Sequence, residues 1–176
     1  GITVFSPLLT YGVKPTQRVG VVGIGGLGHL ALKFARAWGC EVTAFTSSES
    51  KRDEALQLGA HRVVSSVDPK AMKSIAGQLD FIIVTVNVPL EWGPLMSTLA
   101  PNGRLHLVGV QPQPMTLPTG GMIGGQRSVS GSPTGSRIAP QVEYFPMSRI
   151  NEALDYLRAG KPRYRVVLEA DFGTAP

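Results

Sequence analysis

The 176-residue sequence has almost no cysteine and no long apolar run. Its single cysteine, Cys40, has no partner for an internal disulfide, so a reducing cytoplasm is the expected compartment. No apolar stretch is long enough to span a membrane, and the first residues lack the pattern of a signal peptide. An apolar content of 43% with 16% charged residues is typical of a globular protein, and the length suits one domain with a core.

The sequence also lacks a basic cluster, although its formal net charge is +5. Lys and Arg residues are scattered, with only a mild concentration between Arg149 and Arg165, and they form no basic stripe. A nucleic-acid surface needs such a basic patch or stripe. We therefore expect no nucleic-acid partner, whereas an anionic cofactor is compatible with the charge.

Strand-like and helix-like apolar patterns alternate along the chain. In 26–38, for example, Leu27, Ala31 and Phe34 recur at three- and four-residue steps, which is typical of a helix. This alternation predicts an α/β fold with a doubly wound parallel sheet between two layers of helices, a three-layer αβα arrangement. The expected strands are 18–22, 41–46, 62–65, 79–86, 104–110, 142–145 and 164–168, and the expected helices are 26–38, 49–58, 90–99 and 149–159.

The segment 111–136 breaks this alternation. It is rich in Pro and Gly and has no clear apolar period, so we expect a long loop there. Loops of that length inside a compact domain are usually functional.

A glycine-rich turn joins the strand 18–22 to the helix that follows it. Its residues Gly23, Gly25 and Gly28 fit the pattern G-x-G-x-x-G in the strand-turn-helix context that the pattern requires. Gly23 allows the tight turn, Gly25 lets a pyrophosphate approach the backbone, and Gly28 permits close packing of helix on strand. The N–H groups of Gly26 and Leu27 would then point at the anion. The motif predicts a Rossmann-type dinucleotide site, and the alternative is a structural turn without a ligand.

The end of the strand 41–46 indicates which dinucleotide is bound. An NAD-specific fold places Asp or Glu there to bind the ribose 2′-OH. This sequence instead has hydroxyls and cations, namely Thr46, Ser47, Ser48, Lys51 and Arg52. Such groups favour a 2′-phosphate through charge-assisted hydrogen bonds, which predicts NADP(H). Alternatively, Ser48 only caps the next helix and Lys51 is solvated surface, and Glu49 could turn inward and weaken the preference.

Four stretches resemble one known family: "GITVFSPLLTYGVKP", "VVGIGGLGHLALKFARAWG", "EVTAFTSSESKRDEALQLGA" and "RYRVVLEADF". They are similar to the zinc-dependent medium-chain alcohol dehydrogenases, especially the NADP-dependent, cinnamyl-alcohol-dehydrogenase-like branch. The resemblance implies that 1–176 is the dinucleotide-binding domain of a two-domain enzyme. A GroES-like N-terminal domain of the parent would supply the catalytic zinc ligands and the proton relay. Gly1 offers the first helix no cap, which also favours an origin in a longer chain.

We expect no metal site and no catalytic residues in this chain. Its candidate ligands His29, His61, His106 and Cys40 are not at metal-ligand spacing and are expected to be structural. The resemblance also implies a helix near 136–138 for which this sequence has no matching residues. Either the sequence joins two segments across an omitted one, which we favour, or the chain is truly shortened.

The resemblance also implies contacts to the nicotinamide half of the cofactor. These map onto three strand ends, with Thr85 and Val86 at the first, Val108, Gly109 and Val110 at the second, and Ser130, Gly131 and Ser132 at the third. Arg165 matches a basic residue that reaches the pyrophosphate, and its alternative is a surface charge on an edge strand. In the family, subunits pair through this domain near the segment after Val110, so a homodimer is expected.

The implied activity of the parent is hydride transfer between NADP(H) and a primary alcohol or aldehyde. Two alternatives remain open. One is a zinc-free quinone or enone reductase of the same superfamily, which upstream zinc ligands would exclude. The other is a non-catalytic nucleotide-binding module, which predicts a gene for this domain alone.

Overall fold

The computed structural model describes residues 1–132, 142–159, 161, 165–169 and 171. They divide into two compact units, 1–136 and 137–176, which are described separately. Within the described part of the chain, no helix has the length and hydropathy that crossing a membrane requires.

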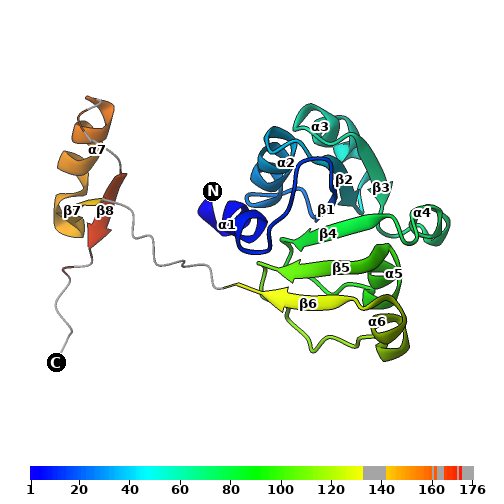
Figure 1. Ribbon diagram of the computed structural model, residues 1–176. Helices are drawn as coiled ribbons and strands as arrows, with labels where there is room; N and C mark the ends of the chain where they lie inside the picture. The colour runs from blue at the N-terminus through cyan, green and yellow to red at the C-terminus, as the bar shows by residue number, and fades with distance from the viewer. Residues whose placement is uncertain (133–141, 160, 162–164, 170, 172–176) are drawn as a thin grey trace. The chain divides into compact units, whose positions relative to one another are not determined.

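The first unit is built on a six-stranded parallel sheet with the strand order β3-β2-β1-β4-β5-β6 (Figure 1). This is the Rossmann order, in which the chain reverses direction across the sheet between β1 and β4. The fold class predicted from the sequence is therefore confirmed. The strands are β1 (Arg18–Val22), β2 (Glu41–Thr46), β3 (Arg62–Ser65), β4 (Leu79–Val84), β5 (Leu99–Leu107) and β6 (Ser128–Gly131).

Helices cover both faces of this sheet (Figure 1). Because side chains alternate along a strand, Val19 and Val21 of β1 lie in one apolar cluster and Val22 in the other. The first cluster contains residues of α1 (Ile2–Thr10), α2 (Gly28–Ala37) and α3 (Arg52–Gln57), the last preceded by the 3-10 turn η1 (Glu49–Lys51). The second cluster is covered by α4 (Pro69–Ser74), α5 (Trp92–Ser97) and α6 (Thr119–Gly125).

The second unit contains a parallel pair of strands, β7 (Val142–Pro146) and β8 (Arg165–Glu169). Between them in sequence lie η2 (Met147–Arg149) and α7 (Ile150–Arg158). Ala153 of α7 is buried, and the rings of Phe145 and Tyr156 are 5.4 Å apart. The predicted strands 142–145 and 164–168 thus pair with each other in a separate two-stranded sheet, and Tyr164 lies outside the described residues.

The expectation of a featureless loop over 111–136 is wrong, because α6 and β6 lie within it. The sequence of α6, TGGMIGG, has low helix propensity, but its Met122 packs against the second apolar cluster. The strand β6 has only four residues and is held by its pairing with β5. Tertiary contacts therefore outweigh local propensity here.

The short helix α4, which begins at Pro69 after an Asp68 cap, was also not predicted from the sequence.

Candidate cofactor-binding site

A cavity of about 520 Å³ opens at the carboxyl ends of the strands β1 to β4. Its walls follow directly after these strands, which is where open α/β sheets bind ligands. It also lies next to β1 and β4, the neighbouring strands between which the strand order reverses. Of the predicted cofactor residues, the structure brings seven together around it: Gly23, Gly25, Thr46, Ser47, Ser48, Lys51 and Val86.

The glycine turn is as compact as the motif predicts. Gly23 has a φ of 90°, a value that favours glycine. A Cβ atom on Gly28 would overlap with the Gly23 carbonyl oxygen and would lie 2.8 Å from the carbonyl carbon. Gly26, Leu27 and Gly28 do not line the cavity, but Leu27 is the N-cap of α2 and its side chain makes no cap hydrogen bond. The helix N-terminus is therefore not capped by a side chain and suits an anion.

The loop after β2 presents hydroxyls and one cation to the cavity. Thr46 Oγ1 accepts a hydrogen bond from the Ser48 N–H at 3.1 Å and lies 3.2 Å from the Ser48 carbonyl, which shapes the loop. Lys51 Nζ donates to the Ile24 carbonyl at 3.2 Å, which places its charge beside the glycine turn. Ser47 and Lys51 are exposed, so both can meet an incoming ligand.

Arg52 and Glu49 do not line this cavity. The Arg52 guanidinium pairs with the Glu49 carboxylate at 3.7 Å, and the Glu49 side chain is 78% exposed. The alternative in which Glu49 turns inward and weakens the preference for NADP(H) is therefore not seen in this structure. Arg52 is the predicted cation that the geometry supports least.

Thr85 connects β4 to the glycine turn through its hydroxyl. Thr85 Oγ1 donates to the Val22 carbonyl at 2.9 Å and lies 3.2 Å from the Gly23 carbonyl. The Thr85 N–H also donates to the Val22 carbonyl at 3.1 Å. The Thr85 side chain therefore stabilises the glycine turn, and this role does not depend on a direct contact between Thr85 and a cofactor.

Replacing Thr85 with valine keeps the side-chain shape and removes this hydroxyl. We expect the free energy of unfolding to fall by about 1 kcal/mol and NADPH binding to weaken a few-fold. Urea unfolding and a fluorescence titration measure the two effects. Thr98→Val is the matched control, because Thr98 is buried and donates to the Leu95 carbonyl at 2.8 Å away from the cavity. Equal loss of binding in both variants would contradict the role of Thr85.

The predicted nicotinamide residues after β5 are in close contact with the segment after β4. The N–H groups of Val108 and Gly109 donate to the Val84 carbonyl at 3.0 and 3.2 Å. A Cβ atom on Gly109 would overlap with the Val86 carbonyl, so glycine is required there. Gln111 adds a hydrogen bond of 2.8 Å from its Nε2 to the same carbonyl. Val108 is buried, whereas Val110 is 81% exposed.

His106 connects the third predicted nicotinamide segment to β5. Its Nδ1 lies 3.0 Å from the Ser130 hydroxyl and its Nε2 lies 3.0 Å from the Ser132 hydroxyl. Burial, together with the nearby Arg104 guanidinium, lowers the pKa of His106 to about 4. Ser130 and Gly131 belong to β6, and Ser132 follows it.

Arg165 is the first residue of β8 in the second unit. Its side chain lies outside the described part of the structure. The predicted pyrophosphate contact therefore stays a prediction, as do the other cofactor contacts.

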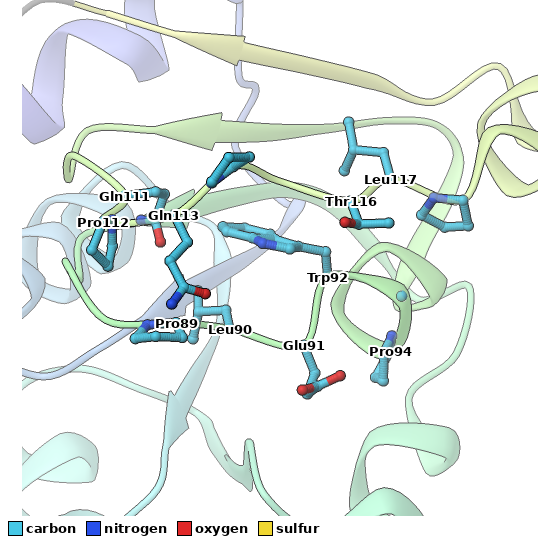
Figure 2. Close-up of a pocket in the computed structure, with 13 residues that line it drawn as sticks. Pro89, Leu90, Glu91, Trp92, Pro94, Gln111, Pro112, Gln113, Thr116 and Leu117 are labelled. Atoms are coloured by element: carbon cyan, nitrogen blue, oxygen red, sulfur yellow. The ribbon is translucent and has the colours of Figure 1, made fainter.

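Several residues of the cavity were not predicted: Ser66, Val67, Val88, Pro89, Leu90 and Glu91. They follow β3 and β4, and the rule that ligands bind at carboxyl ends of strands could have found them. A second cavity of about 470 Å³ shares the segment Pro89 to Glu91 and is otherwise lined by the start of α5 and by residues after β5. Figure 2 shows the Trp92 ring between the side chains of Gln113 and Thr116, which both belong to the Pro-rich part of 111–136.

The described residues do not offer a zinc site, since they contain no group of three or more His, Cys, Asp or Glu side chains suited to a metal. His29 Nδ1 donates to the Gly25 carbonyl at 2.9 Å, and His61 Nδ1 accepts from the Val42 N–H at 2.9 Å. Burial raises the pKa of the Cys40 thiol, which lies 3.7 Å from the Lys14 carbonyl.

Known proteins resemble this chain over nearly its full length. It is 52% identical over 182 residues to the aldehyde reductase AdhA of Synechocystis, covering 96% of this chain and 54% of that protein. It is 40% identical over 185 residues to cinnamyl alcohol dehydrogenase 2 of Rauvolfia serpentina, covering 96% of this chain and 51% of that protein. The chain thus spans about half the length of these relatives. Both aligned lengths exceed 176 residues, so each relative carries residues without a counterpart here. The predicted gap near 136–138 stays a prediction, because those positions lie outside the described residues.

Solved structures show the same likeness. A cinnamyl alcohol dehydrogenase from Sorghum bicolor matches with a TM-score of 0.75 and 36% identity, over 99% of this chain and 55% of that one. A structure of CAD from Helicobacter pylori complexed with NADP(H) matches with a TM-score of 0.68 and 32% identity, over 99% of this chain and 54% of that one. The model of the zinc-binding dehydrogenase family matches residues 26–152. The family match, the relatives and the Rossmann strand order agree with one another. They show that the chain belongs to the zinc-binding dehydrogenase family and is a cofactor domain of the cinnamyl-alcohol-dehydrogenase-like type.

Proposed function

We propose that this chain is the NADP(H)-binding domain of an enzyme that interconverts primary alcohols and aldehydes. The observation that carries the proposal is a cavity with a glycine turn on one side and Ser47, Ser48 and Lys51 on the other. The β2 end, which holds a carboxylate in NAD-specific folds, has none here. The likeness to the Helicobacter pylori CAD complexed with NADP(H) supports the same cofactor, and the likeness to the aldehyde reductase AdhA supports the aldehyde substrate.

Each wall of the cavity has a separate task in this proposal. The N-terminus of α2 binds the pyrophosphate, with Gly25 on the cavity wall. Ser47, Ser48 and Lys51 bind the 2′-phosphate. The segment after β4, which reaches the cavity at Val86, holds the nicotinamide end together with the segments at the ends of β5 and β6, which lie outside the cavity lining. When bound, NADPH supplies the hydride that reduces an aldehyde carbon while a proton reaches the oxygen. In this proposal the chain orients the cofactor, and the zinc ligands and the proton relay belong to the other domain of the parent enzyme.

Steady-state kinetics of the full-length protein test this function. We expect cinnamaldehyde to be reduced with NADPH, much more slowly with NADH, and with loss of activity after treatment with a zinc chelator. Reduction of quinones or enones that survives the chelator would contradict the alcohol dehydrogenase assignment. Tight NADPH binding without turnover of any carbonyl substrate would do so as well.

We further propose that the protein forms a homodimer through this domain. Val110 follows β5 and Ile123 lies in α6, and these large apolar residues are 81% and 79% exposed. Light scattering of the full-length protein checks this. A monomer at micromolar concentration would contradict it.

A further inference from the structure

His106 is a buried polar residue that the cofactor motif does not explain. Its relative exposure is 0%, and its ring packs 6.0 Å from Phe81 and 5.1 Å from Tyr11, measured between ring centroids. A histidine within an apolar core is costly unless both ring nitrogens find hydrogen-bond partners. Here both do, and both partners are serine hydroxyls in or directly after β6.

A neutral imidazole has one donor nitrogen and one acceptor nitrogen. One serine hydroxyl therefore accepts from the ring and the other donates to it, so the two hydroxyls are held in opposite roles. The Tyr11 ring, directly after α1, packs against the His106 ring, and the guanidinium of Arg104, on the same strand as His106, lies 4.3 Å from the centroid of the Tyr11 ring. The guanidinium of Arg104 and the burial of the ring lower the pKa of His106 to about 4, which keeps the imidazole neutral at neutral pH.

The two serines flank Gly131, at the edge of the six-stranded sheet. Apart from the β5–β6 ladder, the main chain here is held by the Ser132 N–H, which donates to the Leu107 carbonyl at 3.3 Å. His106 adds two side-chain hydrogen bonds that span 24 and 26 residues of sequence. It thus ties the edge segment to β5 two residues before Val108.

We propose that His106 is a positioning residue that sets the Ser130–Gly131–Ser132 segment for the nicotinamide half of the cofactor. The proposal rests on the NADP(H) function proposed above, which assigns this segment to the nicotinamide end of the cofactor. His106 does not touch the cofactor in this account and acts through the two serines.

The test compares two probes on the full-length protein. NADPH contains the nicotinamide, whereas adenosine 2′,5′-bisphosphate contains the adenosine, the 2′-phosphate and the 5′-phosphate but no nicotinamide. His106→Phe keeps a ring in the core and removes both nitrogens. We expect it to weaken NADPH binding by about tenfold, from two lost hydrogen bonds, and to reduce the enhancement of bound nicotinamide fluorescence. Binding of adenosine 2′,5′-bisphosphate should stay within about twofold of the wild-type value.

Two further variants keep the proposal testable if His106→Phe does not fold. Ser132→Ala removes the partner of Nε2 without opening the core, and should weaken NADPH binding a few-fold with the bisphosphate unaffected. His106→Asn, which offers both a donor and an acceptor, should recover part of the NADPH affinity. Unchanged NADPH binding in Ser132→Ala and in a folded His106→Phe, or an equal loss for both probes, would overturn the role of His106. Wild-type protein that binds the bisphosphate and not NADPH would instead overturn the proposed function.

Discussion

Gly28→Ala is expected to lower the free energy of unfolding by about 3 kcal/mol and to weaken NADPH binding by about a hundredfold. The added Cβ would overlap with the Gly23 carbonyl and also lie 3.2 Å from Thr85 Oγ1. Because the obstacle is backbone, no side-chain rotation relieves it, and the turn has to move away from α2. The pyrophosphate would then lose the N–H groups that the turn presents. Chemical denaturation and a fluorescence titration measure the two effects.

Two other glycines separate packing from ligand binding. A Cβ on Gly25 meets nothing within 4 Å, but Gly25 lines the cavity. The Gly25→Ala variant should therefore have the stability of the wild type but bind NADPH more weakly than the wild type does. Gly120 in α6 has equally open surroundings and lines neither cavity described above, so Gly120→Ala should leave NADPH binding unchanged and raise the free energy of unfolding by up to about 1 kcal/mol through its higher helix propensity. A Gly28→Ala protein with wild-type stability would show that helix and strand do not pack as closely as described.

Lys51→Ala is expected to weaken NADPH binding by about ten- to a hundredfold while NADH binding changes little, because a hydrogen bond to a charged group contributes about 1.5–3 kcal/mol. The ammonium lies at the glycine turn, 3.2 Å from the Ile24 carbonyl, and on the wall of the cavity. Only NADPH carries the 2′-phosphate that this charge would meet. Titrations with both nucleotides give the ratio directly.

Arg52→Ala is the matched control for Lys51→Ala. The sequence predicts both cations as phosphate ligands, but Arg52 pairs with Glu49 and does not line the cavity. We expect Arg52→Ala to change NADPH affinity by no more than about threefold, a salt-screened surface effect. If Arg52→Ala had the larger effect, the 2′-phosphate would bind on the other side of η1.

The strands β1 to β4 and the glycine turn were predictable because their signals are local. The strands β1, β2 and β3 lie where the apolar pattern places them, and β4 is two residues shorter than expected. The turn needs only the spacing of Gly23, Gly25 and Gly28 and its place between strand and helix. The family resemblance is confirmed by the relatives, while the individual cofactor contacts remain predictions.

The missed features depend on contacts between distant residues. The strand β6 has the sequence SVSG and is held by its pairing with β5, in which Ser130 lies opposite His106, 24 residues away. The helix α6 forms despite its glycines because Met122 packs into the core. Likewise, that Glu49 pairs with Arg52 instead of turning inward depends on side-chain geometry, which a linear pattern does not contain.

The most direct test of the account is a titration of the wild-type protein with NADPH and with NADH, following nicotinamide fluorescence. The account predicts that NADPH binds at least about tenfold more tightly, because the cavity has Lys51 and two serines where an NAD-specific site has an acid. Equal affinities, tighter binding of NADH, or no binding of either nucleotide would contradict it.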